Sequence, residues 1–173
     1  EGGARLAAEH LIKLGRRRIA HVTGPERFEA VRLRRNGYRK ELARAGISVP
    51  SEYYLSGVWS EEWGREAVAK LFATCRSPPD ALFCGNDQIA RGAIDALRER
   101  GIGVPDSVAV VGFDNWEIVA AATRPPLTSV EYAADVNETM ALGAANSSVR
   151  TAEQTEVARF YTEPPPPFWA RNL

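Results

Sequence analysis

Apolar residues follow two different periods along the chain. They recur at helical spacing in four stretches, which are residues 4–14, 30–45, 61–73 and 87–100. Between these stretches lie short apolar runs typical of strands, at residues 19–23, 53–55, 81–84 and 108–113. The last run is almost continuously apolar, as in a strand covered on both faces. The alternation predicts βαβ units, and so an α/β fold in which helices flank a parallel sheet.

The regular pattern ends near Val130. Residues 137–145 are compatible with a weak helix only. The run Pro164–Pro167 is extended and does not fit a central strand, because proline lacks the N–H that a sheet needs. We therefore expect residues 131–173 to be irregular, with a proline-rich tail.

The charge balance changes the range of possible partners. The 173 residues include 22 Lys and Arg against 22 Asp and Glu, so the formal net charge is zero. A domain whose main role is to bind the phosphate backbone of a nucleic acid is usually basic. The zero net charge of this chain therefore argues against direct nucleic-acid binding. No run of apolar residues is long enough to span a bilayer, and no secretory signal opens the chain, so we expect a cytoplasmic protein without a membrane partner. The lack of an initiator Met leaves open whether Glu1 is the natural start.

Neither cysteines nor histidines form a recognisable reactive or metal-binding pattern. Cys75 and Cys84 are too few for a disulfide framework or a zinc site. His10 and His21 lie far apart among apolar neighbours, which favours a structural place for both. No nucleophile elbow, phosphate loop or dinucleotide fingerprint is present. We therefore expect no cofactor, no metal and no enzymatic activity.

Polar residues gather where the predicted strands end. In open parallel sheets, ligands bind beyond the carboxyl ends of the strands. Asn86-Asp87 follows the strand at 81–84, and Asp114-Asn115 follows the strand at 108–113. Each pair is also explained by helix capping alone. Two such pairs at neighbouring strand ends would face one crevice, which favours a binding role.

An aromatic and a cationic residue are predicted at the same carboxyl edge of the sheet. Trp59 lies just past the strand at 53–55, and Arg34 lies early on the helix after Gly24-Pro25. A carboxylate, an amide and a guanidinium can pair with hydroxyl groups, while an aromatic ring covers a C–H face. These groups fit a polyhydroxylated small molecule, and the sequence shows no base and nucleophile for catalysis.

Several motifs together resemble the LacI/GalR family of bacterial transcription regulators. They are Asn86–Ala93, Val108–Asn115 and the stretch Arg124-Pro125-Pro126-Leu127-Thr128-Ser129-Val130, supported upstream by Gly2-Gly3, Gly24-Pro25 and Arg34. The resemblance covers roughly residues 2–132. It implies a type I periplasmic-binding-protein-like core, made of two Rossmann-like subdomains with an effector bound between them.

The resemblance also implies a domain division and a set of site residues. Residues 1–17 would hold the last helix of the N-terminal subdomain, residues 18–130 the complete C-terminal subdomain, and residues 131–173 the crossover and return. The effector-contacting arginine, the packing aromatic, the strand-end amide and the carboxylate would be Arg34, Trp59, Asn86 and Asp114. Phe28 occupies a less constant cleft position. Tyr132 falls where the family often has Gln.

Two functions remain compatible with this resemblance. The first is the effector-sensing part of a regulator, which binds a small molecule such as a sugar. Such regulators act as dimers, here through residues 61–73, 88–100 and 119–123, and reach operator DNA only through an N-terminal helix-turn-helix. The second is a transport-type sugar-binding module. The Pro-Pro-Leu-Thr-Ser-Val stretch favours the regulator.

Overall fold

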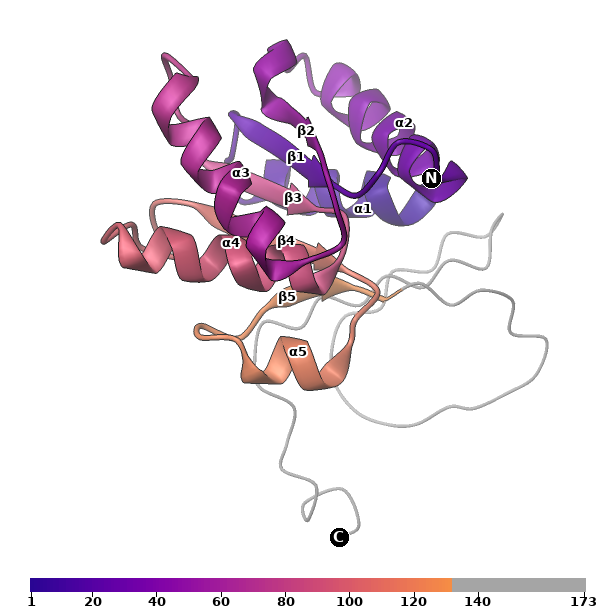
Figure 1. Ribbon diagram of the computed structural model, residues 1–173. Coiled ribbons are helices and arrows are strands. Elements are labelled where there is room, and N and C mark those ends of the chain that lie inside the picture. The colour runs from indigo at the N-terminus through magenta and orange to yellow at the C-terminus, as the bar shows by residue number, and fades with distance from the viewer. Residues whose placement is uncertain (132–173) are drawn as a thin grey trace, which may run out of the picture.

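The computed structural model describes residues 1–131, which form a parallel sheet covered on both faces by helices (Figure 1). The strands lie in the order β2-β1-β3-β4-β5, and every pairing is parallel. Their bounds are β1 (Ile19–Thr23), β2 (Tyr54–Ser56), β3 (Ala81–Cys84), β4 (Ala109–Phe113) and β5 (Thr128–Val130). The helices are α1 (Gly2–Lys13), α2 (Glu29–Arg44), α3 (Glu61–Thr74), α4 (Asp87–Glu99) and α5 (Glu117–Ala122), with a 3₁₀ turn η1 (Ser51–Tyr53) before β2.

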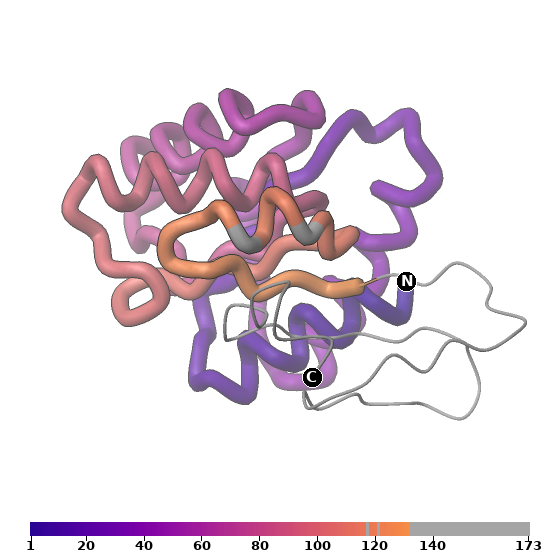
Figure 2. The backbone as a smooth tube through the Cα atoms, turned by 90° about the horizontal axis from the view of Figure 1, so that it is seen from below, coloured from indigo at the N-terminus to yellow at the C-terminus, as the bar shows by residue number. Residues whose placement is uncertain are grey.

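Alternate residues of the central strands point to opposite faces of the sheet, and each face has its own core. On one face, Ala20, Leu82 and Val110 pack with residues of α3 and α4. On the other face, Ile19 and Phe83 pack with residues of α1 and α2. Figures 1 and 2 show the resulting three layers, with the short helix α5 beside α4 at the β5 end of the sheet.

The predicted α/β fold with a parallel sheet is confirmed. The four predicted helices and four predicted strands are all present, with ends that differ by a residue or two. The apolar pattern did not predict α5 or β5. Both are short, and β5 contains Thr128 and Ser129, so neither produces a recognisable period.

Helix α1 packs on the sheet together with α2. Leu6, Ala7 and Leu11 of α1 are buried in the same core cluster as Phe83 of β3. The two helices on this face approach closely, because a Cβ on Gly37 of α2 would lie 2.2 Å from the carbonyl oxygen of Glu1. The assignment of residues 1–17 to a second subdomain stays a prediction, since residues 1–131 hold a single sheet on which α1 can pack.

The expectations for residues 131–173 fall, apart from residue 131, outside the described residues, and so do those for Tyr132, residues 137–145 and Pro164–Pro167. Among the helices of residues 1–131, none combines the length and the apolar character needed to cross a bilayer.

Candidate functional site

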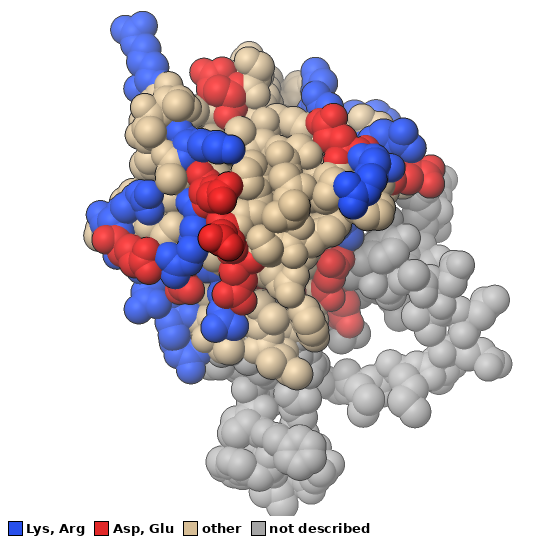
Figure 3. Space-filling view, viewed as in Figure 1, with Lys and Arg blue, Asp and Glu red and all other residues tan. Residues whose placement is uncertain are grey.

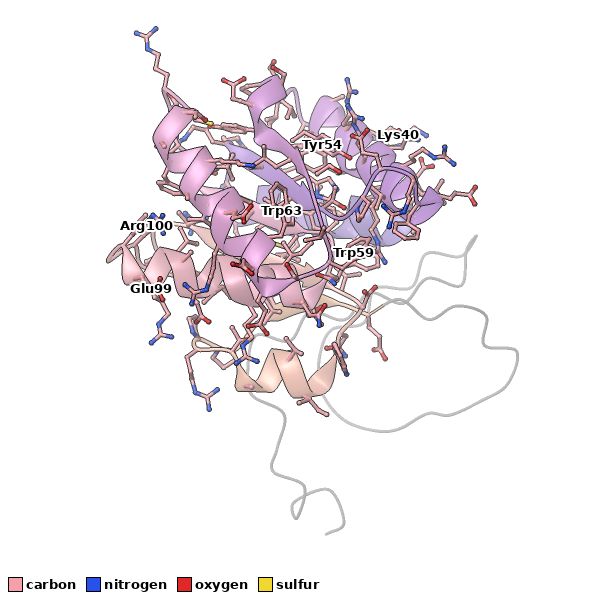
Figure 4. The ribbon with its side chains drawn as sticks, in the orientation of Figure 1. Lys40, Tyr54, Trp59, Trp63, Glu99 and Arg100 are labelled. Carbon is pink, nitrogen blue, oxygen red and sulfur yellow. The ribbon has the colours of Figure 1, made fainter. Side chains whose placement is uncertain are left out.

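Four chain segments, one after each of the strands β1 to β4, meet at the carboxyl edge of the sheet. Phe28 and Arg34 come from the segment after β1, and Trp59 from the loop after β2. Asn86 follows β3, and Asp114 follows β4. Because all these strands are parallel, the five predicted residues share one end of the sheet. Figure 4 labels Trp59 in its loop and Trp63 on the neighbouring helix α3.

Arg34 and Asp114 form the polar centre of this edge. The guanidinium donates from Nη2 to Oδ1 of Asp114 at 2.8 Å and from Nη1 to the carbonyl oxygen of Gly85 at 2.7 Å. Its Cζ also lies 3.9 Å from the centre of the Phe113 ring. The arginine side chain is 14% exposed, whereas the aspartate side chain is 50% exposed. Arg34 is thus fixed by several contacts. The carboxylate of Asp114, which it holds, can be reached by solvent or a ligand.

The environment of Asp114 combines two opposing electrostatic effects. Partial burial raises the pKa of its carboxyl group, because a charged group loses hydration there. The Arg34 guanidinium opposes this shift by its charge and its hydrogen bond. The pair therefore keeps a charge-assisted hydrogen bond at the rim of the site.

The loop after β4 has an unusual backbone. Asp114 and Asn115 are both in the left-handed region, with φ of 91° and 46°. Residues other than glycine adopt this conformation at a cost of about 1–3 kcal/mol each, and only where the surroundings impose it. In this backbone conformation the Asp114 carboxylate accepts from the Arg34 guanidinium. Strain of this kind is typical of a functional loop.

Asn86 and Asp87, predicted as a pair, have separate roles. Oδ1 of Asn86 accepts from the N–H of Ile89 at 2.9 Å, so the capping explanation is confirmed for that oxygen. Asp87 is 1% exposed, and its carboxylate accepts from the N–H of Trp116 and from the hydroxyl of Ser129. Asp87 is therefore directed at the loop that carries Asp114.

Two aromatic side chains form an apolar wall beside the polar centre. The rings of Phe28 and Trp59 lie 6.4 Å apart and are tilted by 43°. Phe28 is 41% exposed, and Trp59 is half-buried against Gly24. A Cβ on Gly24 would lie 2.2 Å from the Trp59 ring, so only glycine lets this ring lie over the end of β1. The wall offers aromatic surface to a ligand at the edge.

Two other observations concern metal-binding groups and surface hollows among the described residues. Within residues 1–131, no group of three or more His, Cys, Asp or Glu side chains is arranged to hold a metal ion. A surface hollow of about 490 Å³ lies between the start of α1 and α2, lined by Glu1, Gly2, Arg5, Gly37, Lys40 and Arg44. None of the five predicted residues lines it.

The family described as "periplasmic binding protein-like domain" matches residues 8–155. This chain belongs to that family. The ribose operon repressor of Escherichia coli (strain K12) is 38% identical over 133 residues, which are 77% of this chain and 40% of the repressor. The chain thus spans less than half the length of the curated relatives that it matches.

Solved structures of LacI-type regulators have the same fold. A transcriptional regulator CelR–cellobiose complex superposes with a TM-score of 0.71 at 38% identity, over 75% of this chain and 39% of the other. A regulatory protein of the LacI family from Chloroflexus aggregans gives a TM-score of 0.71 at 35% identity, over 75% and 46% of the two chains. The resemblance to the LacI/GalR effector-binding core is therefore confirmed.

Proposed function

We propose that this chain is the effector-sensing part of a LacI-type transcription regulator and that its effector is a small polyhydroxylated molecule, a sugar above all. The observation that carries the proposal is the Arg34–Asp114 pair, fixed at the carboxyl edge of the sheet beside the aromatic side chains of Phe28 and Trp59. The alternative, a transport-type binding module, has less support, because the relatives are named as operon repressors and transcriptional regulators.

Each site residue has a distinct task in this proposal. The Asp114 carboxylate accepts hydrogen bonds from neighbouring hydroxyl groups, and the Arg34 guanidinium donates to ring or hydroxyl oxygens. The Asn86 side chain uses its oxygen for the helix cap, so its amide nitrogen is the group it presents to a ligand. Trp59 and Phe28 cover the C–H face of the sugar ring. The arrangement binds and orients a ligand and supplies no step of bond cleavage.

Control of DNA binding follows from the position of the site at a sheet edge. A second subdomain across this edge would close on the effector, and the closed and open forms would present two helix-turn-helix heads differently to an operator.

Dimerisation through α3, α4 and residues 119–123 would couple two such chains in the cytoplasm. Figure 3 shows acidic and basic side chains interleaved over α3 and α4, as in the pairs that Arg65 makes with Asp95 and Glu99. Such a surface suits a symmetric partner better than a phosphate backbone.

A calorimetric titration tests the ligand class. D-ribose, cellobiose and a purine base are titrated into the full-length regulator and into its Asp114→Ala variant. We expect saturable binding of a sugar and a loss of about tenfold or more in affinity on removing the carboxylate, since hydrogen bonds to charged groups contribute about 1.5–3 kcal/mol.

Asp106→Ala is the matched control, because Asp106 is an exposed aspartate that precedes β4 at the other end of the strand. Its affinity for the sugar should equal that of the wild type. Binding of the purine alone, or sugar binding that survives in Asp114→Ala, would contradict the proposal.

A further inference from the structure

Asp87 is a buried acidic residue that has no task in the proposed binding of the effector. It is the first residue of α4, yet the side-chain cap of that helix is made by Asn86. Its carboxylate instead crosses to the segment after β4. Oδ2 accepts from the N–H of Trp116 at 2.6 Å, and Oδ1 accepts from the hydroxyl of Ser129 at 2.5 Å. A buried carboxylate needs such partners, because an unpaired charge is costly away from water.

With these contacts, three consecutive backbone N–H groups, those of residues 114–116, each donate a hydrogen bond. The N–H of Asp114 donates to the carbonyl oxygen of Val130 at 2.9 Å. The N–H of Asn115 donates to Oγ of Ser129 at 3.1 Å. The N–H of Trp116 donates to Asp87, which also accepts from Ser129. Two of the three N–H groups therefore depend on Asp87, one directly and one through the Ser129 hydroxyl.

The same three residues include the two with left-handed φ values, Asp114 and Asn115. Such backbone persists only when neighbouring groups over-determine it. The sheet leaves room for Asp87 to do this, because a Cβ on Gly112 would lie 2.3 Å from Oδ1 of Asp87. The carboxylate thus reaches the loop across a gap that only glycine leaves open.

We propose that Asp87 is a positioning residue of the effector site, which holds the loop of residues 114–116 so that the Asp114 carboxylate meets Arg34. Asp87 touches no ligand in this proposal and acts through Trp116 and Ser129. Its meaning for effector binding rests on the proposed function, whereas the contacts that it controls can be measured without any effector.

Amide hydrogen exchange measured on the whole chain by NMR tests the loop directly. In Asp87→Ala, exchange at Asn115 and Trp116 should rise about tenfold or more, since both lose hydrogen bonds that depend on a charged group. The Asp114 amide, bonded to Val130, is an internal reference and should change less. In Asp87→Asn, the carboxamide oxygen still accepts from Trp116 but carries no charge, so protection of that amide should lie between that of Asp87→Ala and that of the wild type.

The matched control is Asp95→Asn, the same substitution on the same helix. Asp95 is partly exposed, and its carboxylate lies near Arg65 and Arg98. Its replacement should leave exchange at residues 114–116 unchanged. The control separates the role of Asp87 from any general effect of removing an acidic residue from α4.

A second measurement reads the site rather than the loop backbone. Arg34 donates from Nη2 to Asp114 and from Nη1 to Gly85. In heteronuclear NMR of the guanidinium, Asp87→Ala should speed exchange of the Nη2 protons several-fold more than that of the Nη1 protons. A residue that only stabilised the fold would not produce this difference between two nitrogens of one side chain.

The pH dependence adds a third readout. Burial raises the pKa of Asp87 to about 6, while its hydrogen bonds from Ser129 and Trp116 oppose the shift and the charge of Asp114 adds to it. Cys84, at the end of β3, is the other titratable group coupled to it by charge. Protection of the Trp116 amide, corrected for intrinsic exchange, should therefore fall as the pH drops through about 6 in the wild type and stay flat in Asp87→Asn.

The results separate this proposal from the proposed function. Unchanged exchange at residues 115 and 116 in Asp87→Ala would overturn the positioning role. An equal rise at these amides and at those of β1 and β3 would also overturn it, since that is the signature of global opening. Neither measurement contains an effector, so a failure to bind sugars leaves the exchange result intact.

Discussion

Trp59 and Trp63 lie four positions apart and have different surroundings. Trp63 is 6% exposed, and its Nε1–H donates to the carbonyl oxygen of Thr23 at 3.0 Å. Trp59 is half-buried, and its ring lies beside Phe28 at the edge of the sheet. One tryptophan therefore belongs to the core that joins α3 to β1, and the other belongs to the candidate site.

Replacing each tryptophan by alanine should separate stability from binding. Trp63→Ala should lower the free energy of unfolding by about 3–5 kcal/mol, the usual cost of deleting a large buried side chain. Trp59→Ala should cost less stability and lower sugar affinity about tenfold, because it removes the face that packs against the ligand. Chemical denaturation and calorimetric titration measure the two effects. Equal losses of stability with unchanged affinity in Trp59→Ala would remove this residue from the site.

Strand β1 carries a buried histidine at the centre of the sheet. His21 is fully buried, its ring stacks on Phe83 with centres 4.4 Å apart, and its Nδ1–H donates to the Phe83 carbonyl oxygen at 2.9 Å. Burial lowers the pKa of His21 to about 4, the hydrogen bond to Phe83 opposes the shift, and the charges of Arg34 and Arg35 add to it. The strand is therefore built around a neutral imidazole.

This histidine should make stability depend on pH in a known direction. Between the folded pKa of about 4 and the unfolded value of 6.5, the unfolded chain binds the proton and the folded chain does not. Stability from His21 is thus complete above pH 6.5 and is lost as the pH falls toward 4, with a total on the order of 3 kcal/mol. The difference in unfolding free energy between wild type and His21→Phe should grow with pH across this window.

Urea denaturation at several pH values measures that difference. Comparing the two proteins cancels the contribution of Asp87, whose raised pKa acts in the opposite direction over nearly the same range. A difference that stays constant from pH 4 to pH 7 would show that His21 is not kept neutral by the fold.

The elements differ in how far the sequence could predict them. Strands β1 and β3 have their predicted bounds, because each is a short, mostly apolar run that follows charged residues or prolines and ends at a glycine. Strand β5 was not predicted, because it lacks an apolar pattern. Its residue Ser129 is polar, and its hydroxyl is buried with a hydrogen bond to Asp87. The partner of α1 could not be predicted, because helical spacing shows which face of a helix is apolar but not which sheet that face packs against.

The candidate site shows the same limit. Arg34 and Asp114 are 80 positions apart; the order of strands and helices predicted that they share an edge, but not that they form a hydrogen bond. Local spacing did predict that Asn86 could cap α4. The direction of Asp87 could not be predicted, because it depends on the space left by Gly112 across the sheet. Residues whose role is tertiary leave little signal in a single sequence.

The whole chain has balanced charge, which bears on whether it binds DNA by itself. Its formal net charge is zero, and acidic side chains are interleaved with basic ones over α3 and α4. Tight binding to a duplex requires several phosphate contacts from Lys and Arg, whose counterion release dominates affinity. If the proposed function holds, a sensing unit with this surface would need a separate DNA-binding head to reach an operator.

We therefore expect the 173-residue chain alone not to bind operator DNA at physiological salt. A mobility-shift titration with the operator of the full-length regulator should show no sequence-specific complex, while the full-length protein should form one that weakens as salt is raised. An excess of unrelated DNA controls for weak non-specific contacts. A specific, salt-sensitive complex with the isolated chain would mean that the described fold itself reads DNA, and the division of labour between sensing unit and DNA-binding head would then be wrong.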